Sequence, residues 1–120
     1  VTGELDLSYA PVLIDGDKAI YHILFDSATE NISGLIDFGT AGFGDPACDI
    51  AVQLSNYGES IVSRMESDYP MLKDVIDRAR FWVGTIELQW ALAGVKSNQI
   101  SLSLAHIGLA RDVRPIGTRL

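Results

Sequence analysis

The sequence contains a single cysteine, Cys48, few basic residues and no long apolar run. One cysteine excludes an internal disulfide and a metal site built from several thiolates, and it suits a reducing compartment. No stretch of about 18 uninterrupted apolar residues is present, which argues against a membrane-spanning helix. We therefore expect a soluble, cytoplasmic protein.

Basic side chains are outnumbered by acidic ones, with nine Lys and Arg against 16 Asp and Glu and a formal net charge of −7. This charge argues against binding to a nucleic-acid backbone and favours a neutral or cationic small-molecule partner. The alternative is that the charge serves only solubility. With 120 residues, of which 48% are hydrophobic, the chain suits a single domain or one part of a larger protein.

The pattern of the chain changes near residue 45. Residues 1–44 are β-rich, with three short apolar runs separated by turn-like segments; the runs are residues 11–14, 21–26 and 32–38. Residues 45–120 are helical in pattern, and we predict four helices, which begin near residues 45, 60, 70 and 98. The third helix is apolar around much of its girth, which is typical of a buried central helix. The sequence therefore predicts an α+β fold with a short antiparallel hairpin and about four helices.

The second and third apolar runs are expected to pair as a hairpin in which Asp26 faces Ser33. In that register His22 faces Asp37, and opposed residues point to the same face with their Cβ atoms about 4.5–5.5 Å apart. Asp17 lies on the loop that enters the hairpin, five residues before His22. Two carboxylates and an imidazole would then meet at one edge. The structural alternative is a polar hairpin mouth stabilised by a His–Asp pair.

The order of these residues matches the needs of phosphoryl transfer. That reaction uses an Asp that orients the acceptor hydroxyl, and side chains that hold Mg²⁺ against the nucleotide phosphates. Kinases place the metal ligands five residues after the first Asp and, beyond a hairpin, in Asp-Phe-Gly. This chain has Asp17, His22 and Asp37-Phe38-Gly39 in that order.

Two segments, "DGDKAIYHILFD" and "GLIDFGTAGFGDPACDIA", resemble the catalytic and metal-binding segment of the aminoglycoside phosphotransferases. These are antibiotic-resistance kinases with a eukaryotic-like kinase fold, and His22 with the residues after it is most similar to their 2''-branch. The resemblance implies that Asp17 is the catalytic aspartate and that His22 and Asp37 are Mg²⁺ ligands. It also implies ATP or GTP as the phosphate donor and an aminoglycoside-type acceptor.

The chain departs from the pattern of that family at two positions. Asp15 stands where the family usually has histidine, and Thr40 stands where the 2''-branch tends to carry an acidic residue. His22 is also a softer ligand than Mg²⁺ normally selects, so a hydrogen-bonding role is the alternative for it.

Kinase folds also use an N-terminal lobe with a glycine-rich loop and a lysine that pairs with the nucleotide phosphates. The only lysines here are Lys18, Lys73 and Lys96, and we interpret the glycines at residues 39, 42 and 44 as turn formers. We therefore expect residues 1–120 to be a C-terminal lobe without the nucleotide-binding lobe, and to be inactive alone. This leaves open whether the chain acts as an enzyme.

Other side chains are candidates near the site. Asp45 is expected to cap the first helix, and Asp49 to bond the backbone of the catalytic loop. Glu87 lies within the apolar third helix and needs a partner, which is either an arginine or a cationic ligand. Trp82 and Trp90 are interpreted as core residues.

Three functional hypotheses remain at this point. The chain is the catalytic and substrate-binding part of a small-molecule kinase, a catalytically silent kinase-like binding module, or an unrelated α+β domain in which the motif is coincidental. An uncovered first strand at residues 11–14 and an incompletely shielded third helix also predict a homodimer.

Overall fold

The computed structural model describes residues 5–120, apart from the side chains of residues 110 and 111. The strands are β1 (Val12–Ile14), β2 (Ile23–Asp26), β3 (Asn31–Leu35) and β4 (Gly42–Gly44), and a 3-10 turn, η1 (Ile20–His22), precedes β2. The helices are α1 (Ala47–Tyr57), α2 (Glu59–Val62), the 3-10 segment η2 (Ser63–Ser67), α3 (Leu72–Lys96) and α4 (Ile100–Asp112). The predicted α+β fold is confirmed. None of the helices in this part of the chain is long and apolar enough to cross a membrane.

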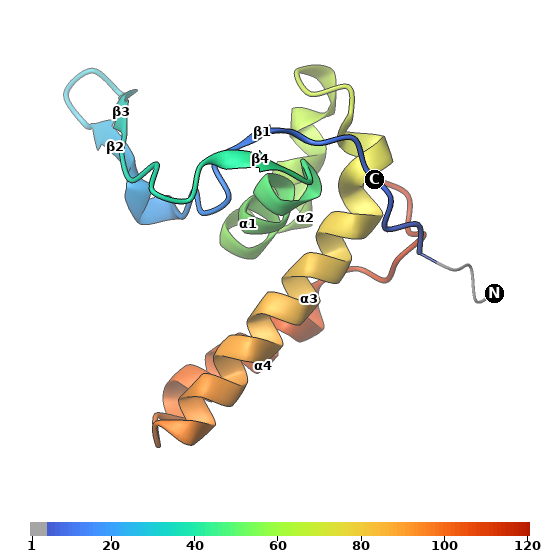
Figure 1. Ribbon diagram of the computed structural model, residues 1–120. Coiled ribbons are helices and arrows are strands. Elements are labelled where there is room, and N and C mark those ends of the chain that lie inside the picture. Colours follow the sequence, from blue (N-terminus) through green and yellow to red (C-terminus); the bar gives the residue numbers. More distant parts are fainter. Residues whose placement is uncertain (1–4) are drawn as a thin grey trace.

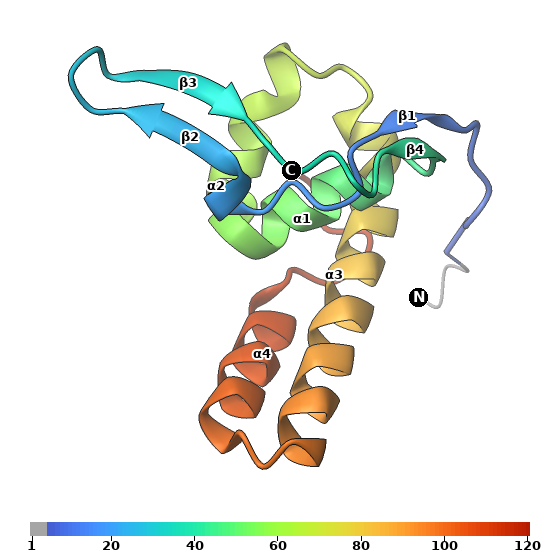
Figure 2. The same cartoon turned by 60° about the vertical axis from the view of Figure 1, so that its left-hand side comes forward.

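The molecule has a small helical centre and two projecting limbs (Figures 1 and 2). The β2–β3 hairpin extends to one side, and the pair formed by α4 and the second half of α3 extends in another direction. The radius of gyration is 15.3 Å, whereas a compact domain of this length has about 14 Å. Apolar side chains of both limbs are exposed, among them Phe25 and Ile32 in the hairpin and Leu92 and Leu104 in the helix pair.

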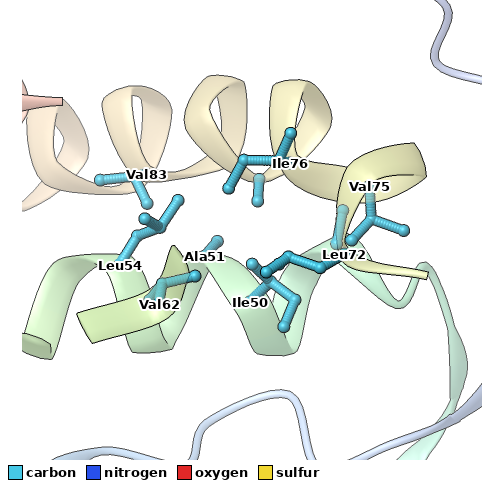
Figure 3. Packing of buried hydrophobic residues seen from close by; sticks show 10 residues of the cluster. Ile50, Ala51, Leu54, Val62, Leu72, Val75, Ile76 and Val83 are labelled. Atoms are coloured by element: carbon cyan, nitrogen blue, oxygen red, sulfur yellow. The ribbon is translucent and has the colours of Figure 1, made fainter. Parts of the chain in front are cut away.

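The hydrophobic core lies between α1, α2 and the first half of α3 (Figure 3). On α1 the buried side chains are spaced so that they share one face, and the same is true of α3 up to Val83. The core residues are Ala47, Ile50, Ala51, Leu54, Val62, Leu72, Val75, Ile76, Ala79 and Val83. This core fixes α1, whose first turn carries residues of the candidate site.

The second half of α3 is not buried as the sequence predicted. Leu88, Trp90, Leu92 and Val95 are each more than half exposed. The physical reason is that α4 packs along this half of α3 and leaves its other faces open. The contact between the two helices is close at Gly94, where an added Cβ atom would lie 2.8 Å from a backbone nitrogen of α4. The interpretation of Trp90 as a core residue was therefore wrong.

The first strand is paired, contrary to prediction. β1 and β4 form an antiparallel two-stranded sheet in which Leu13 lies opposite Phe43. Two of the glycines interpreted as turn formers, Gly42 and Gly44, lie within β4 itself, and Gly44 lies close to the flexible end of a side chain of β1. A Cβ atom there would lie 2.7 Å from Ile14 Cδ1. The argument for self-association from an unpaired first strand does not hold, and the homodimer itself stays a prediction.

The predicted hairpin exists, but its register differs from the predicted one. Asp26 lies opposite Asn31 instead of Ser33, and the register shifts between Leu24 and Phe25. The turn is tight because the Asp26 carboxylate accepts hydrogen bonds from the Ala28 N–H (2.9 Å) and the Thr29 hydroxyl (2.9 Å). Such Asx turns set the loop length and therefore the pairing of the strands.

Candidate functional site

Asp49, in the first turn of α1, holds the loop that carries Asp17. One Asp49 oxygen accepts a hydrogen bond from the Gly16 N–H at 2.7 Å, and the other accepts one from the Asp15 N–H at 3.1 Å. Gly16 has φ +82°, a conformation that glycine adopts without strain, and a Cβ atom there would lie 3.4 Å from Thr40 O. The loop is thus fixed to a helix that the core holds in place.

Asp17 follows this fixed turn, and its side chain is exposed. It lines a pocket of about 520 Å³ whose other walls come mainly from α1, α3 and α4. Its backbone carbonyl accepts a hydrogen bond of 2.8 Å from Nδ1 of His22. Asp17 therefore lies at the edge of a space large enough for a small molecule, and its backbone carbonyl is held by His22.

His22 joins Asp17 to Asp37. Because a carbonyl oxygen only accepts, Nδ1 carries a proton, and in the neutral ring the lone pair is then on Nε2. Nε2 lies 3.5 Å from Asp37 Oδ2, and the imidazole is buried. The predicted meeting of His22 and Asp37 is found, but η1 brings it about, not two opposed strand positions.

Asp37 lies two residues beyond the end of β3, in an unusual backbone conformation. Its φ is +60°, in the left-handed region, which only a few per cent of non-glycine residues adopt, Asp more often than most. The side chain is 62% exposed although it neighbours the buried His22. The Asp37 carboxylate is therefore accessible to a ligand.

The side chains fit a metal ion that a ligand helps to bind, and do not form a complete protein cage. No group of three or more His, Cys, Asp or Glu side chains in the described part of the chain is arranged to hold a metal. Mg²⁺ is usually held by one or two carboxylates together with waters and substrate phosphates. Asp37, with the Nε2 atom of His22 beside it, is suited to that mode of binding.

Glu87 is a buried acid in the wall of the same pocket, with only 3% of the residue exposed. Ser55 donates a hydrogen bond to one of its oxygens, and His106 Nδ1 donates to the other, both at 2.5 Å. The ring of His106 stacks on Trp90, with 6.0 Å between their centroids. The partner required for Glu87 is therefore a histidine and a serine, neither of which the sequence pattern connects with it.

Asp45 joins the start of α1 to α3. Its carboxylate accepts hydrogen bonds from the Ala47 N–H (2.9 Å), from Arg78 (3.1 Å) and from the Trp82 indole (3.2 Å). Burial by itself raises the pKa of Asp45, but these hydrogen bonds and the charge of Arg78 outweigh it and lower the pKa below its ordinary value. Asp45 therefore stabilises the junction behind the site and does not face the pocket.

Replacing Asp45 with Asn is expected to lower the free energy of unfolding by about 3 kcal/mol at pH 7, because it leaves Arg78 without its buried partner. The folded-state pKa lies below the unfolded value of 3.8. The stabilisation is therefore complete well above pH 4 and is lost as the pH falls through the folded pKa. Urea unfolding between pH 2.5 and 7 measures this, with the exposed Asp68→Asn as control. If the difference in free energy of unfolding between wild type and Asp45→Asn did not shrink in acid, the lowered pKa of Asp45 would be contradicted.

The structure thus brings together four of the residues selected from the sequence, Asp17, His22, Asp37 and Asp49, and places Glu87 in the same pocket as Asp17. It also reveals two contacts that the sequence did not indicate. Thr40 donates a hydrogen bond to Asp15 O at 2.8 Å, and Lys18 forms an ion pair with the Asp15 carboxylate at 2.8 Å. The first contact ties residue 15 to the segment after Asp37, and the second is an ion pair within the loop around Asp17.

An aspartate on a helix-anchored loop, linked by an imidazole to a second aspartate after a hairpin, is an arrangement that suits phosphoryl transfer. Residues 3–82, two thirds of the chain, match the sequence pattern of the phosphotransferase enzyme family, APH. The chain belongs to this family.

A solved structure with a similar fold is the GDP complex of wild-type aminoglycoside 2'-phosphotransferase-IIIa, with a TM-score of 0.67 and 25% sequence identity. The similarity covers 87% of this chain and 36% of that one, so the chain spans about a third of the length of that protein. A comparison with curated proteins gave no match.

Proposed function

We propose that the chain provides the catalytic loop, the metal-binding carboxylate and the acceptor pocket of a nucleotide-dependent phosphotransferase. Asp17 orients the acceptor hydroxyl and takes its proton, and Asp37 with His22 holds Mg²⁺. One observation carries this proposal: a single imidazole contacts the backbone of Asp17 and the carboxylate of Asp37. The two aspartates are thereby held in a fixed relation, as in-line transfer requires.

The phosphate donor in this proposal is a purine nucleoside triphosphate. The similar solved structure is a complex with GDP, which supports GTP, and ATP is the alternative. When bound, Mg²⁺ would neutralise charge on the phosphates. The part of the chain described here offers Asp37 and His22 for that ion.

The acceptor in this proposal is a small, hydroxylated, cationic molecule of the aminoglycoside type. Two acidic residues line the pocket of about 520 Å³, the exposed Asp17 and the buried Glu87. This volume lies in the usual range for small-molecule sites. A hydroxyl group at Asp17 and an ammonium group near Glu87 would orient such a molecule.

We also propose that residues 1–120 alone transfer no phosphate at a useful rate. Positioning of the triphosphate supplies most of the catalysis in this chemistry, and kinases use a lysine for it. Lys18 is buried and pairs with Asp15 at 2.8 Å, and neither Lys73 nor Lys96 lines the pocket that contains Asp17. None of the three is therefore placed to hold phosphates beside Asp17.

Kanamycin is expected to bind the chain and change the fluorescence of Trp90, which is half exposed and stacks on His106 in the pocket wall. Replacing Glu87 with Gln should weaken this binding about tenfold, because it removes the negative charge in the pocket wall that attracts a cationic ligand. Fluorescence titration measures both affinities. The matched control is Glu66→Gln, which removes an acid outside this pocket and should leave the affinity unchanged. Equal affinity of Glu87→Gln and wild type would contradict the acceptor assignment.

A further inference from the structure

Lys18 directly follows Asp17, yet its side chain points into the protein. Only 9% of the residue is exposed. Its Nζ atom donates a hydrogen bond of 2.8 Å to Ile36 O and lies 4.1 Å from the centroid of the Phe38 ring. Ile36 and Phe38 are the residues on either side of Asp37. Lys18 therefore contacts the proposed metal-binding segment at the residue before Asp37 and at the residue after it.

The same ammonium group forms the ion pair with Asp15 at 2.8 Å, where both side chains are nearly buried. Within residues 5–120, no hydrogen-bond donor is assigned to this Asp15 oxygen (Oδ2), so the ion pair with Lys18 is what balances its charge. Removing Lys18 alone would leave the nearly buried Asp15 carboxylate without a compensating charge and would destabilise the fold. A variant that tests Lys18 therefore changes Asp15 as well. The additional negative charge that Asp15 brings to the catalytic loop is thus neutralised inside the site.

We propose that Lys18 is a positioning residue that locks the Asp37 segment onto the catalytic loop through Ile36 O, the Phe38 ring and the Asp15 carboxylate. It acts on the metal site through the backbone on each side of Asp37, without touching the metal or the substrate. These contacts help to hold Asp37 at φ +60°, a backbone conformation that most non-glycine residues do not favour. The inference rests on the proposed roles of Asp17 and Asp37.

Metal binding separates positioning from a simple effect of charge. If Lys18 acted only through its charge, removing it would make the site more negative, and divalent cations would bind more tightly. If it positions Asp37, removing it weakens their binding. Asp15→Asn/Lys18→Met removes both charges of the pair and leaves the net charge unchanged. The amide introduced in place of the Asp15 carboxylate retains an acceptor for the Asp17 N–H, which in the wild-type chain bonds Asp15 at 3.3 Å.

The experiment titrates Mn²⁺ into the 120-residue chain and follows the free ion by electron paramagnetic resonance. Asp15→Asn/Lys18→Met is expected to bind Mn²⁺ about tenfold more weakly than wild type, the loss typical when a group supporting a metal ligand is removed. Lys18→Arg keeps a cation for the carboxylate and the ring, so it should stay within about twofold of wild type. The control is Lys73→Met, which removes an exposed lysine paired with Glu66 and should have no effect. Wild-type affinity in the double variant would overturn the proposal.

Hydrogen exchange of the metal-free chain provides a second readout. The Ile36 N–H donates to His22 O at 3.0 Å, and the Ala41 N–H donates to Phe38 O at 3.1 Å. Amides of residues 36–41 should exchange about tenfold faster in the double variant and at the wild-type rate in Lys18→Arg and Lys73→Met. Unchanged exchange in the double variant, or faster exchange in Lys18→Arg, would overturn the proposal. If the unaltered chain binds no Mn²⁺, the proposed metal role of Asp37 fails, and exchange alone decides the role of Lys18.

Discussion

Replacing Arg80 with Met is expected to lower the free energy of unfolding by about 3–5 kcal/mol, the usual loss when one partner of a buried ion pair is removed. Only 3% of Arg80 is exposed. Its guanidinium group bonds Glu59 at 2.8 and 3.1 Å and Asp77 at 2.9 Å. Burial alone would lower the pKa of Arg80, but these two carboxylates raise it above its ordinary value, so the charge is retained.

The loss is large because Arg80 connects three parts of the chain. It ties α2, through Glu59, to α3, and it donates a hydrogen bond of 2.7 Å to Thr118 O in the C-terminal segment. Replacing Arg80 also removes the positive charge beside the Glu59 carboxylate. Only 10% of the Glu59 side chain is exposed, so solvent compensates little for this loss. Met fills a similar volume, so the effect reports the lost charge and not a cavity.

Urea unfolding at pH 7 measures the change. Arg64→Met, on an exposed side chain of η2, is the control and should lie within about 0.5 kcal/mol of wild type. Glu59→Gln/Arg80→Met should recover part of the loss, because the unpaired carboxylate is then removed as well. A loss below about 1 kcal/mol in Arg80→Met would show that the network contributes little to stability.

The meeting of the candidate site residues was largely predictable because its signal is local. Asp17, His22 and Asp37 lie within 21 residues, and the structure brings them together as the sequence predicted, while their chemical roles stay a proposal. The contact between His22 and Asp37 was expected for an incorrect geometric reason, since the actual hairpin register differs from the assumed one. The side chain of Asp26 set that register through the turn, and strand periodicity does not encode such a contact.

The contacts that the sequence did not reveal join residues distant in the chain. Lys18 meets Ile36, and Ser55 and His106 meet Glu87 from two other helices. Composition and periodicity show that a buried acid needs a partner, but they do not say which one, because tertiary packing makes that choice. The same limit applies to α3, whose apolar girth indicated burial although α4 covers only part of its second half.

Replacing Asp37 with Asn is expected to weaken Mn²⁺ binding about 100-fold. Asp37 is the carboxylate that the structure offers to a metal beside His22 Nε2, and a charge interaction near a protein surface at about 4 Å is worth several kcal/mol. Asn keeps the shape and one oxygen but loses the charge. Mn²⁺ is a suitable probe because, like Mg²⁺, it prefers oxygen ligands.

The most direct test of the phosphotransferase site is therefore an electron paramagnetic resonance titration of Mn²⁺ into wild type, Asp37→Asn and Glu30→Gln. Glu30 is an exposed acid in the hairpin turn and controls for general loss of negative charge. The proposal predicts one bound ion in wild type and in Glu30→Gln, and almost none at the same concentrations in Asp37→Asn. Equal Mn²⁺ binding by Asp37→Asn and wild type would contradict it.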